Sequence, residues 1–161
     1  MRMANPLPAR RLFVGLSRVM APGIRHGVIR STRAGGRLCV LQTRGRRSGK
    51  LREAALDYAD APSGIWVAAG WARSTAWYLN LLAEPRVSVS LEGRRRDGIA
   101  TTVTDPIERL RAIRAILAAS GFVARLYGYD LRTVSDERLD ADFEATPIVL
   151  VTFAPTVPTT P

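Results

Sequence analysis

The chain has 161 residues, 47% of them apolar, and carries a formal net charge of +10. That length suits one domain with a sizeable core, and that apolar fraction excludes global disorder. No apolar run reaches the roughly 18 residues that a membrane-spanning helix needs. A strongly basic chain attracts an anionic ligand, an anionic membrane or nucleic acid. The cations are spread along the chain without a basic tail, so we expect no nucleic-acid partner.

Cysteine and histidine are scarce, because Cys39 and His26 are the only residues of their types. An internal disulfide is therefore excluded, and we expect no metal site. Cys39 lies in an apolar run and is interpreted as a small buried hydrophobic residue. Three arginines interrupt the apolar residues near the N-terminus, which disfavours a signal peptide, so we expect a cytoplasmic protein.

Residues 1–33 are predicted to form an N-terminal segment with one helix and a linker. Residues 9–20 place apolar side chains at helical spacing, in the order Leu12, Phe13, Leu16, Val19 and Met20. We favour packing of this helix on its own domain. Peripheral association with a membrane surface is the second interpretation.

Residues 34–153 are predicted to form the main domain, and residues 154–161, rich in Pro and Thr, a disordered tail. Strand patterns cover residues 37–43, 53–59, 65–69, 86–91, 95–103 and 148–153. Helices are predicted to follow caps at Ser74, Asp105 and Ser135. The second helix should bury Ile107, Leu110, Ile113 and Leu117. Short strands with hairpin-like connections favour an α+β, mainly β fold: a mostly antiparallel sheet or barrel flanked by helices.

A basic loop separates the first two strands. Residues 43–52 read Thr-Arg-Gly-Arg-Arg-Ser-Gly-Lys-Leu-Arg. Arginine, serine and backbone N–H groups are the parts that proteins use to bind phosphate or carboxylate, and two glycines allow tight backbone geometry. We interpret the loop as an anion-binding site, and a solvated basic turn is the alternative.

A second motif follows the third strand. Residues 77–85 read Trp-Tyr-Leu-Asn-Leu-Leu-Ala-Glu-Pro, shortly after Gly70 and Trp71. Tryptophans at 66, 71 and 77 could flank a flat ring, which suits a cofactor that carries its own reactivity. The alternative for Trp77 is simple packing together with Leu81, one helical turn further on.

Together the two motifs resemble those of the deazaflavin-dependent nitroreductase family, within the flavin/deazaflavin oxidoreductase superfamily. This family uses coenzyme F420, an 8-hydroxy-5-deazaflavin, on a split β-barrel of about six strands. The first motif corresponds to its Thr-x-Gly-Arg-Lys/Arg-Ser/Thr-Gly-x-Pro-Arg pattern, with Leu51 in place of the proline. Where some members have Ser-Lys after the third strand, this chain has Gly70 and Trp71.

The resemblance implies a role for each matched position. The phosphate and the anionic tail of the cofactor would be held by Gly45, Arg46, Arg47, Ser48, Gly49 and Arg52. The deazaflavin ring would be bordered by Ala68, Ala69, Gly70 and Trp71, and closed on one side by Trp77, Tyr78 and Asn80. Tyr127 and Tyr129 are candidates for lining the substrate pocket or donating a proton, and an ordinary half-buried turn is the alternative for them.

The function implied is hydride transfer from reduced coenzyme F420 to a small apolar acceptor such as a quinone or a nitroaromatic. Two alternatives keep the same fold: a non-catalytic protein that binds the cofactor or a lipid, and an FMN-dependent reductase. Split barrels commonly pair their sheets, so a homodimer is also expected.

Overall fold

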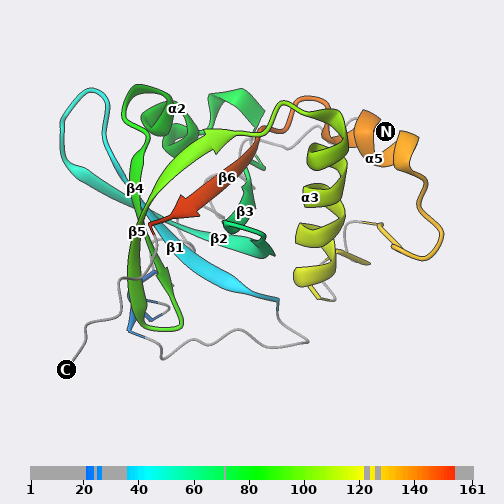
Figure 1. The fold of residues 1–161 in the computed structure, drawn as a ribbon, viewed down its shortest axis with the longest axis horizontal. Coiled ribbons are helices and arrows are strands. Elements are labelled where there is room, and N and C mark those ends of the chain that lie inside the picture. The colour runs from blue at the N-terminus through cyan, green and yellow to red at the C-terminus, as the bar shows by residue number, and fades with distance from the viewer. Residues whose placement is uncertain are drawn as a thin grey trace.

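The computed structural model describes residues 21–23, 25–26, 36–70, 72–121, 124–125 and 128–154. In this part of the chain, six strands form a closed antiparallel barrel in the order β1-β2-β3-β6-β5-β4 (Figure 1). The strands are β1 (Leu38–Arg44), β2 (Leu51–Ala61), β3 (Gly64–Ala68), β4 (Arg86–Leu91), β5 (Arg94–Thr102) and β6 (Ile148–Phe153). The predicted fold class is confirmed. Both ends of each predicted strand lie within two residues of the ends of an observed strand.

The helical elements with bounds inside the described residues are η1 (Ala72–Ser74), α2 (Ala76–Ala83), α3 (Pro106–Ala119) and α5 (Asp136–Phe143), and residues 21–23, 25 and 124–125 are also helical. Two predicted caps are confirmed. Asp105 accepts a hydrogen bond from the backbone nitrogen of Glu108 at 2.8 Å, and Ser135 accepts one from Arg138 at 3.2 Å. The cap at Ser74 is wrong, because Ser74 ends a 3₁₀ turn and Thr75 is the N-cap of α2.

The buried face of α3 also differs from the prediction. The helix buries Ala112, Ile113, Ile116 and Leu117, whereas the side chain of Ile107 is 72% exposed. At about 100° per residue, Ile107 points to the opposite side of the helix from Ile116. The buried face of α3 is centred on Ile116, so it does not include Ile107, which the predicted spacing had placed on it.

The barrel interior is the main core. Its strands contribute fully buried side chains that include Leu41, Ile65, Val67, Val89, Val149 and Val151. Helix α2 lies over one end of the barrel, at the top in Figure 1, and adds Trp77, Tyr78 and Leu81 to the same core. The packing role considered for Trp77 and Leu81 is therefore confirmed.

A second core lies outside the barrel, where α3 and α5 cover the outer face of β3 and its neighbours. Strand β3 is buried on both faces, as its continuous apolar pattern predicts. Ile65 and Val67 point into the barrel, and Trp66 points into the outer core. Cys39 has no exposed surface, and this burial raises the pKa of its thiol far above the ordinary value.

Several predictions concern residues outside the described part of the chain. They are the helix at 9–20, the side chains of Trp71 and Tyr127, and the tail beyond residue 154. Among the helices that are described, none is both long and apolar enough to cross a membrane.

Candidate functional site

The basic loop between β1 and β2 closes on itself. Gly45 donates its N–H to the carbonyl of Lys50 at 2.8 Å and accepts from Gly49 at 2.7 Å. The guanidinium of Arg44 donates to the carbonyl of Gly49 at 2.9 Å. Gly49 has a φ of +65°, a left-handed conformation that favours glycine. At Gly45, a Cβ atom would lie only 3.0 Å from the hydroxyl of Ser48. The backbone conformation at position 49 therefore favours glycine, and the turn leaves little room for a side chain at position 45.

Five cationic side chains crowd this turn without a carboxylate partner among the described residues: Arg44, Arg46, Arg47, Lys50 and Arg52. Within the same limits, the backbone N–H groups of Arg47 and Ser48 also have no hydrogen-bond acceptor. Like charges this close repel one another, and an anion bound between them would relieve that repulsion. The loop thus has the charge and the free donors of an anion site.

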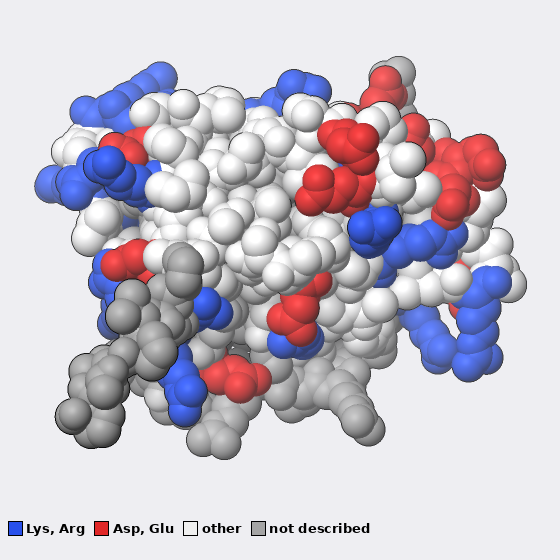
Figure 2. Space-filling view, viewed as in Figure 1, with Lys and Arg blue, Asp and Glu red and all other residues white. Residues whose placement is uncertain are grey.

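The charges are unevenly distributed over the molecule. Figure 2 shows Lys and Arg side chains gathered at the left, where the β1–β2 loop lies, and several Asp and Glu side chains at the right, over α3 and α5. A field of this kind attracts an anionic ligand toward the loop end of the barrel.

Asn80, from the second motif, reaches the loop directly. Its side-chain oxygen accepts from the backbone nitrogen of Arg46 and from the guanidinium of Arg46, both at 3.2 Å. Its side-chain nitrogen donates to the hydroxyl of Thr43 at 3.2 Å. The two sequence motifs therefore meet in the fold, as their joint resemblance requires.

The neighbours of Asn80 on α2 face inward. Trp77 and Tyr78 are 8% and 5% exposed, and their rings meet edge to face with centroids 6.3 Å apart. The hydroxyl of Tyr78 hydrogen-bonds to that of Thr102 at 3.1 Å. These contacts fix α2 on the barrel. A direct contact of either ring with a cofactor stays a prediction.

The end of β3 has one buried and one open residue. Ala69 is fully buried, and its N–H donates to the carbonyl of Pro147 at 2.9 Å. Gly70 is exposed, and a Cβ atom there would meet no described residue within 4 Å, its two chain neighbours aside. Figure 1 shows α2 between the basic loop and η1, which follows Gly70 closely in the chain. The residues proposed for the ring and those proposed for the phosphate thus lie on the same end of the barrel.

Tyr129 is the described member of the predicted tyrosine pair. It is 4% exposed, and its hydroxyl donates to the carboxylate of Asp142 at 3.2 Å. Burial, followed by the nearby charge of Asp142, raises the pKa of its phenol. The phenol therefore keeps its proton at neutral pH, while its contacts lie with α5. Its role as a proton donor or pocket residue stays a prediction.

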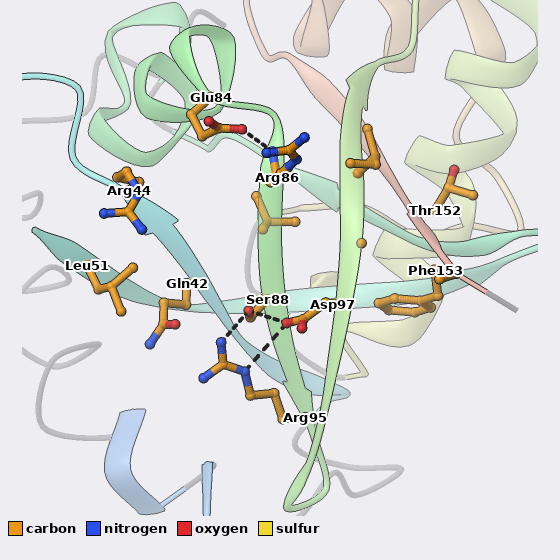
Figure 3. Close-up of a pocket in the computed structure, with 14 residues that line it drawn as sticks. Gln42, Arg44, Leu51, Glu84, Arg86, Ser88, Arg95, Asp97, Thr152 and Phe153 are labelled. Atoms are coloured by element: carbon orange, nitrogen blue, oxygen red, sulfur yellow. Dashed lines mark hydrogen bonds and ion pairs between the residues drawn. The ribbon is translucent and has the colours of Figure 1, made fainter. Parts of the chain in front are cut away.

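A groove of about 750 Å³ opens beside the loop, along β1, β4 and β5 with contributions from β2 and β6 (Figure 3). Its lining combines apolar residues such as Leu51, Ile99 and Phe153 with the arginines Arg44, Arg86 and Arg95. Arg95 hydrogen-bonds to Ser88 at 2.7 Å and pairs with Asp97 at 3.5 Å. None of the site residues predicted from the sequence lines this groove. It was missed because it is assembled from the outward side chains of strands distant in sequence.

Thr43 and Arg44 were also missed as site residues. Thr43 is 1% exposed and accepts the hydrogen bond from Asn80, and Arg44 closes the turn. Alternation in β1 offers a signal for Thr43, because it shares the inward face with Cys39 and Leu41. A polar side chain on a buried face requires a partner.

No group of three or more His, Cys, Asp or Glu that could hold a metal ion occurs among the described residues. A barrel with a basic loop at one end is suited to attract an anionic ligand. Residues 23–128 match the family model of the F420H(2)-dependent quinone reductases, and the chain belongs to this family of oxidoreductases. The family's cofactor is coenzyme F420, as the sequence resemblance implies.

Solved structures share the fold at low sequence identity. An F420-H2 dependent reductase has a TM-score of 0.50 and 21% identity, covering 71% of this chain and 92% of its own. A domain-swapped dimer has a TM-score of 0.53 and 20% identity, covering 89% and 98%. A conserved hypothetical protein from Mycobacterium tuberculosis has a TM-score of 0.52 and 19% identity, covering 72% of each chain. No curated protein matches the chain.

The described residues fit coenzyme F420 on chemical grounds. A phosphate and an anionic tail need cations and N–H donors, and the loop offers both without internal competition. A flat ring needs room, and the space beside Gly70 is open.

Proposed function

We propose that the chain transfers a hydride from reduced coenzyme F420 to a small, apolar, electron-poor acceptor such as a quinone or a nitroaromatic. The observation that carries this proposal is the cluster of five loop cations without carboxylate partners among the described residues. A ligand with several negative charges explains such a cluster, and the family of the chain is defined by one.

In this proposal the cofactor spans one end of the barrel. Its phosphate and tail are held by Gly45, Arg46, Arg47, Ser48, Gly49 and Arg52, and its ring lies against Ala68, Ala69, Gly70 and Trp71. When bound, reduced coenzyme F420 supplies the hydride that the acceptor receives. The side chains therefore bind, orient and exclude water, and no nucleophile is required of them.

Trp77 and Tyr78 contribute rigidity to the ring side. Because both side chains are buried in the barrel core, α2 cannot shift without disrupting that core. This fixes the position of Asn80, which lies on the same helix. Tyr127 and Tyr129 remain proposed for the acceptor side, to line the substrate pocket or to donate a proton.

An acceptor screen tests the proposal. The protein is mixed anaerobically with reduced coenzyme F420, and menadione or a nitroaromatic is added while the deazaflavin absorbance is followed. We expect oxidation that depends on both protein and acceptor, and no comparable rate with reduced FMN. Binding of reduced F420 without turnover on any acceptor would contradict the enzymatic role and favour a non-catalytic binding protein.

We also propose that the chain forms a homodimer. A structural neighbour of the same barrel fold is a domain-swapped dimer, which supports pairing of such barrels. Light scattering on the eluting protein tests this directly. A mass near 35 kDa, twice the 17.6 kDa of one chain, is expected, and a single-chain mass at high concentration would contradict it.

A further inference from the structure

The link between Asn80 and the basic loop is buried and specific. Asn80 is 5% exposed and Thr43 is 1% exposed, so both lie beneath the loop. The side-chain oxygen of Asn80 accepts two hydrogen bonds from Arg46, and its side-chain nitrogen donates to Thr43. Figure 1 shows the loop and α2 side by side at the same end of the barrel. Both ends of the amide are therefore engaged within the protein.

The bond to the backbone of Arg46 determines which donors the loop presents. With the N–H of Arg46 turned inward to Asn80, the next two N–H groups, of Arg47 and Ser48, keep no acceptor among the described residues. Successive N–H groups that point to one side form a concave anion site. Asn80 thus acts on a ligand through the loop, although the family resemblance placed it beside the ring.

The chemical identity of residue 80 matters as much as its position. An aspartate there could accept the same hydrogen bonds, but its charge would compensate that of Arg46. A neutral amide holds the guanidinium of Arg46 and leaves the positive charge of the loop undiminished. Five adjacent cations repel one another when no ligand is bound, so a tether that does not neutralise them keeps the loop in shape for an anion.

We propose that Asn80, supported by Thr43, is a positioning residue that holds the phosphate-binding loop in its ligand-ready conformation without reducing its charge. This inference rests on the proposed function for the identity of the anion. The shape of the loop and its charge can be tested separately. Substitution of Asn80 by alanine should disturb the shape, and substitution by aspartate should reduce the net positive charge.

Amide hydrogen exchange of the protein without cofactor tests the shape. The amide of Arg46 should be protected in the wild type and exchange faster in Asn80→Ala, whereas Asn80→Asp should keep the protection. Thr43→Val should also speed the exchange, and Thr43→Ser should not, because serine keeps the hydroxyl. Thr102→Val is the matched control: it leaves the hydroxyl of Tyr78 on the same helix without its partner but does not touch the loop.

Titration with reduced coenzyme F420 tests the consequence. Asn80→Ala should weaken binding about five- to tenfold, the range for the loss of one good hydrogen bond. Asn80→Asp should also weaken binding, because its charge compensates that of Arg46. Thr43→Ser and Thr102→Val should bind like the wild type. The proposal is overturned if Asn80→Ala binds normally, or if the amide of Arg46 is unprotected in the wild type. If the amide behaves as expected but the wild type binds no F420, the proposed function fails and the positioning role stands.

Discussion

The side-chain oxygen of Asn80 lies 3.2 Å from the backbone nitrogen of Arg46, 34 residues earlier in the chain. This single contact joins the two motifs on which the functional argument rests. Because Asn80 belongs to a helix fixed in the barrel core, its hydrogen bond with Arg46 restrains the loop relative to that core. A preformed loop loses less conformational freedom when it binds an anion, so its affinity is higher.

Arg52 should contribute strongly to cofactor affinity. It lies directly across the β1–β2 ladder from Thr43, with its stem against Gly45. If it contacts the phosphate, Arg52→Ala should weaken the binding of reduced F420 by about 1.5–3 kcal/mol, the range for a charged hydrogen bond. Calorimetric titration measures this. Arg111→Ala, at an exposed position of α3, is the control and should bind normally, and equal affinities for both variants would make Arg52 an ordinary surface arginine.

The left-handed turn at Gly49 offers a test of loop shape. Alanine in this conformation costs roughly 1–2 kcal/mol, so the loop of Gly49→Ala should leave the left-handed turn when no ligand is bound. Binding of the anion must then restore that turn at the same free-energy cost. We expect about 5–30-fold weaker binding of reduced F420. Gly93→Ala imposes a similar strain, since Gly93 has a φ of +84°, but it lies in the β4–β5 hairpin away from α2. A loss of affinity in Gly93→Ala of the same size would show that general destabilisation is responsible.

The open space at Gly70 predicts a variant that folds but turns over slowly. Gly70→Leu introduces a side chain where no described residue, its two chain neighbours aside, lies within 4 Å of the Cβ position, so the melting temperature should stay unchanged. If the ring occupies that space, its displacement should reduce kcat with menadione at least about tenfold. Ala76→Leu adds the same side chain at an exposed position of α2 and serves as the control. Full activity of Gly70→Leu would show that the ring does not occupy that space.

Strands such as β3 and β4 were predictable because β3 runs continuously apolar and β4 alternates, and the loop because its composition is unusual. The contact of Asn80 with Arg46 was not predictable, because it depends on how α2 docks on the barrel. Ile107 shows the same limit: helical spacing fits two faces of α3, and only the packing against β2 and β3 selects between them. The groove beside Arg44 had no local signal, since residues of five strands assemble it.

Asp57 should make stability depend on pH. Burial, only partly offset by a hydrogen bond from Ser120, raises the pKa of this half-buried carboxyl. A raised pKa in the folded state means that stability is lost as the pH rises through that pKa. Asp57→Asn should therefore raise the melting temperature at pH 7, and the gain should shrink as the pH falls toward 4.

Asp97 should change the pH dependence of stability in the opposite direction to Asp57. The hydrogen bond from Ser88, supported by Arg95, lowers the pKa of this exposed carboxyl, so its stabilising effect is present at neutral pH and lost in acid. Asp97→Asn should lower the melting temperature slightly at pH 7 and leave it unchanged at low pH. Melting curves of both variants between about pH 2 and pH 8 check the pair. Parallel curves for Asp57→Asn and the wild type would contradict the burial argument.

The central claim is that the basic loop holds the anionic part of coenzyme F420. The most direct test is an absorbance titration of the wild type and of an Arg46→Ala, Arg47→Ala double variant with the cofactor, at equal ionic strength. We predict saturable binding by the wild type at or below the order of tens of micromolar, and at least about tenfold weaker binding by the double variant. The absence of wild-type binding in that range, or equal affinities for the two proteins, would contradict the account.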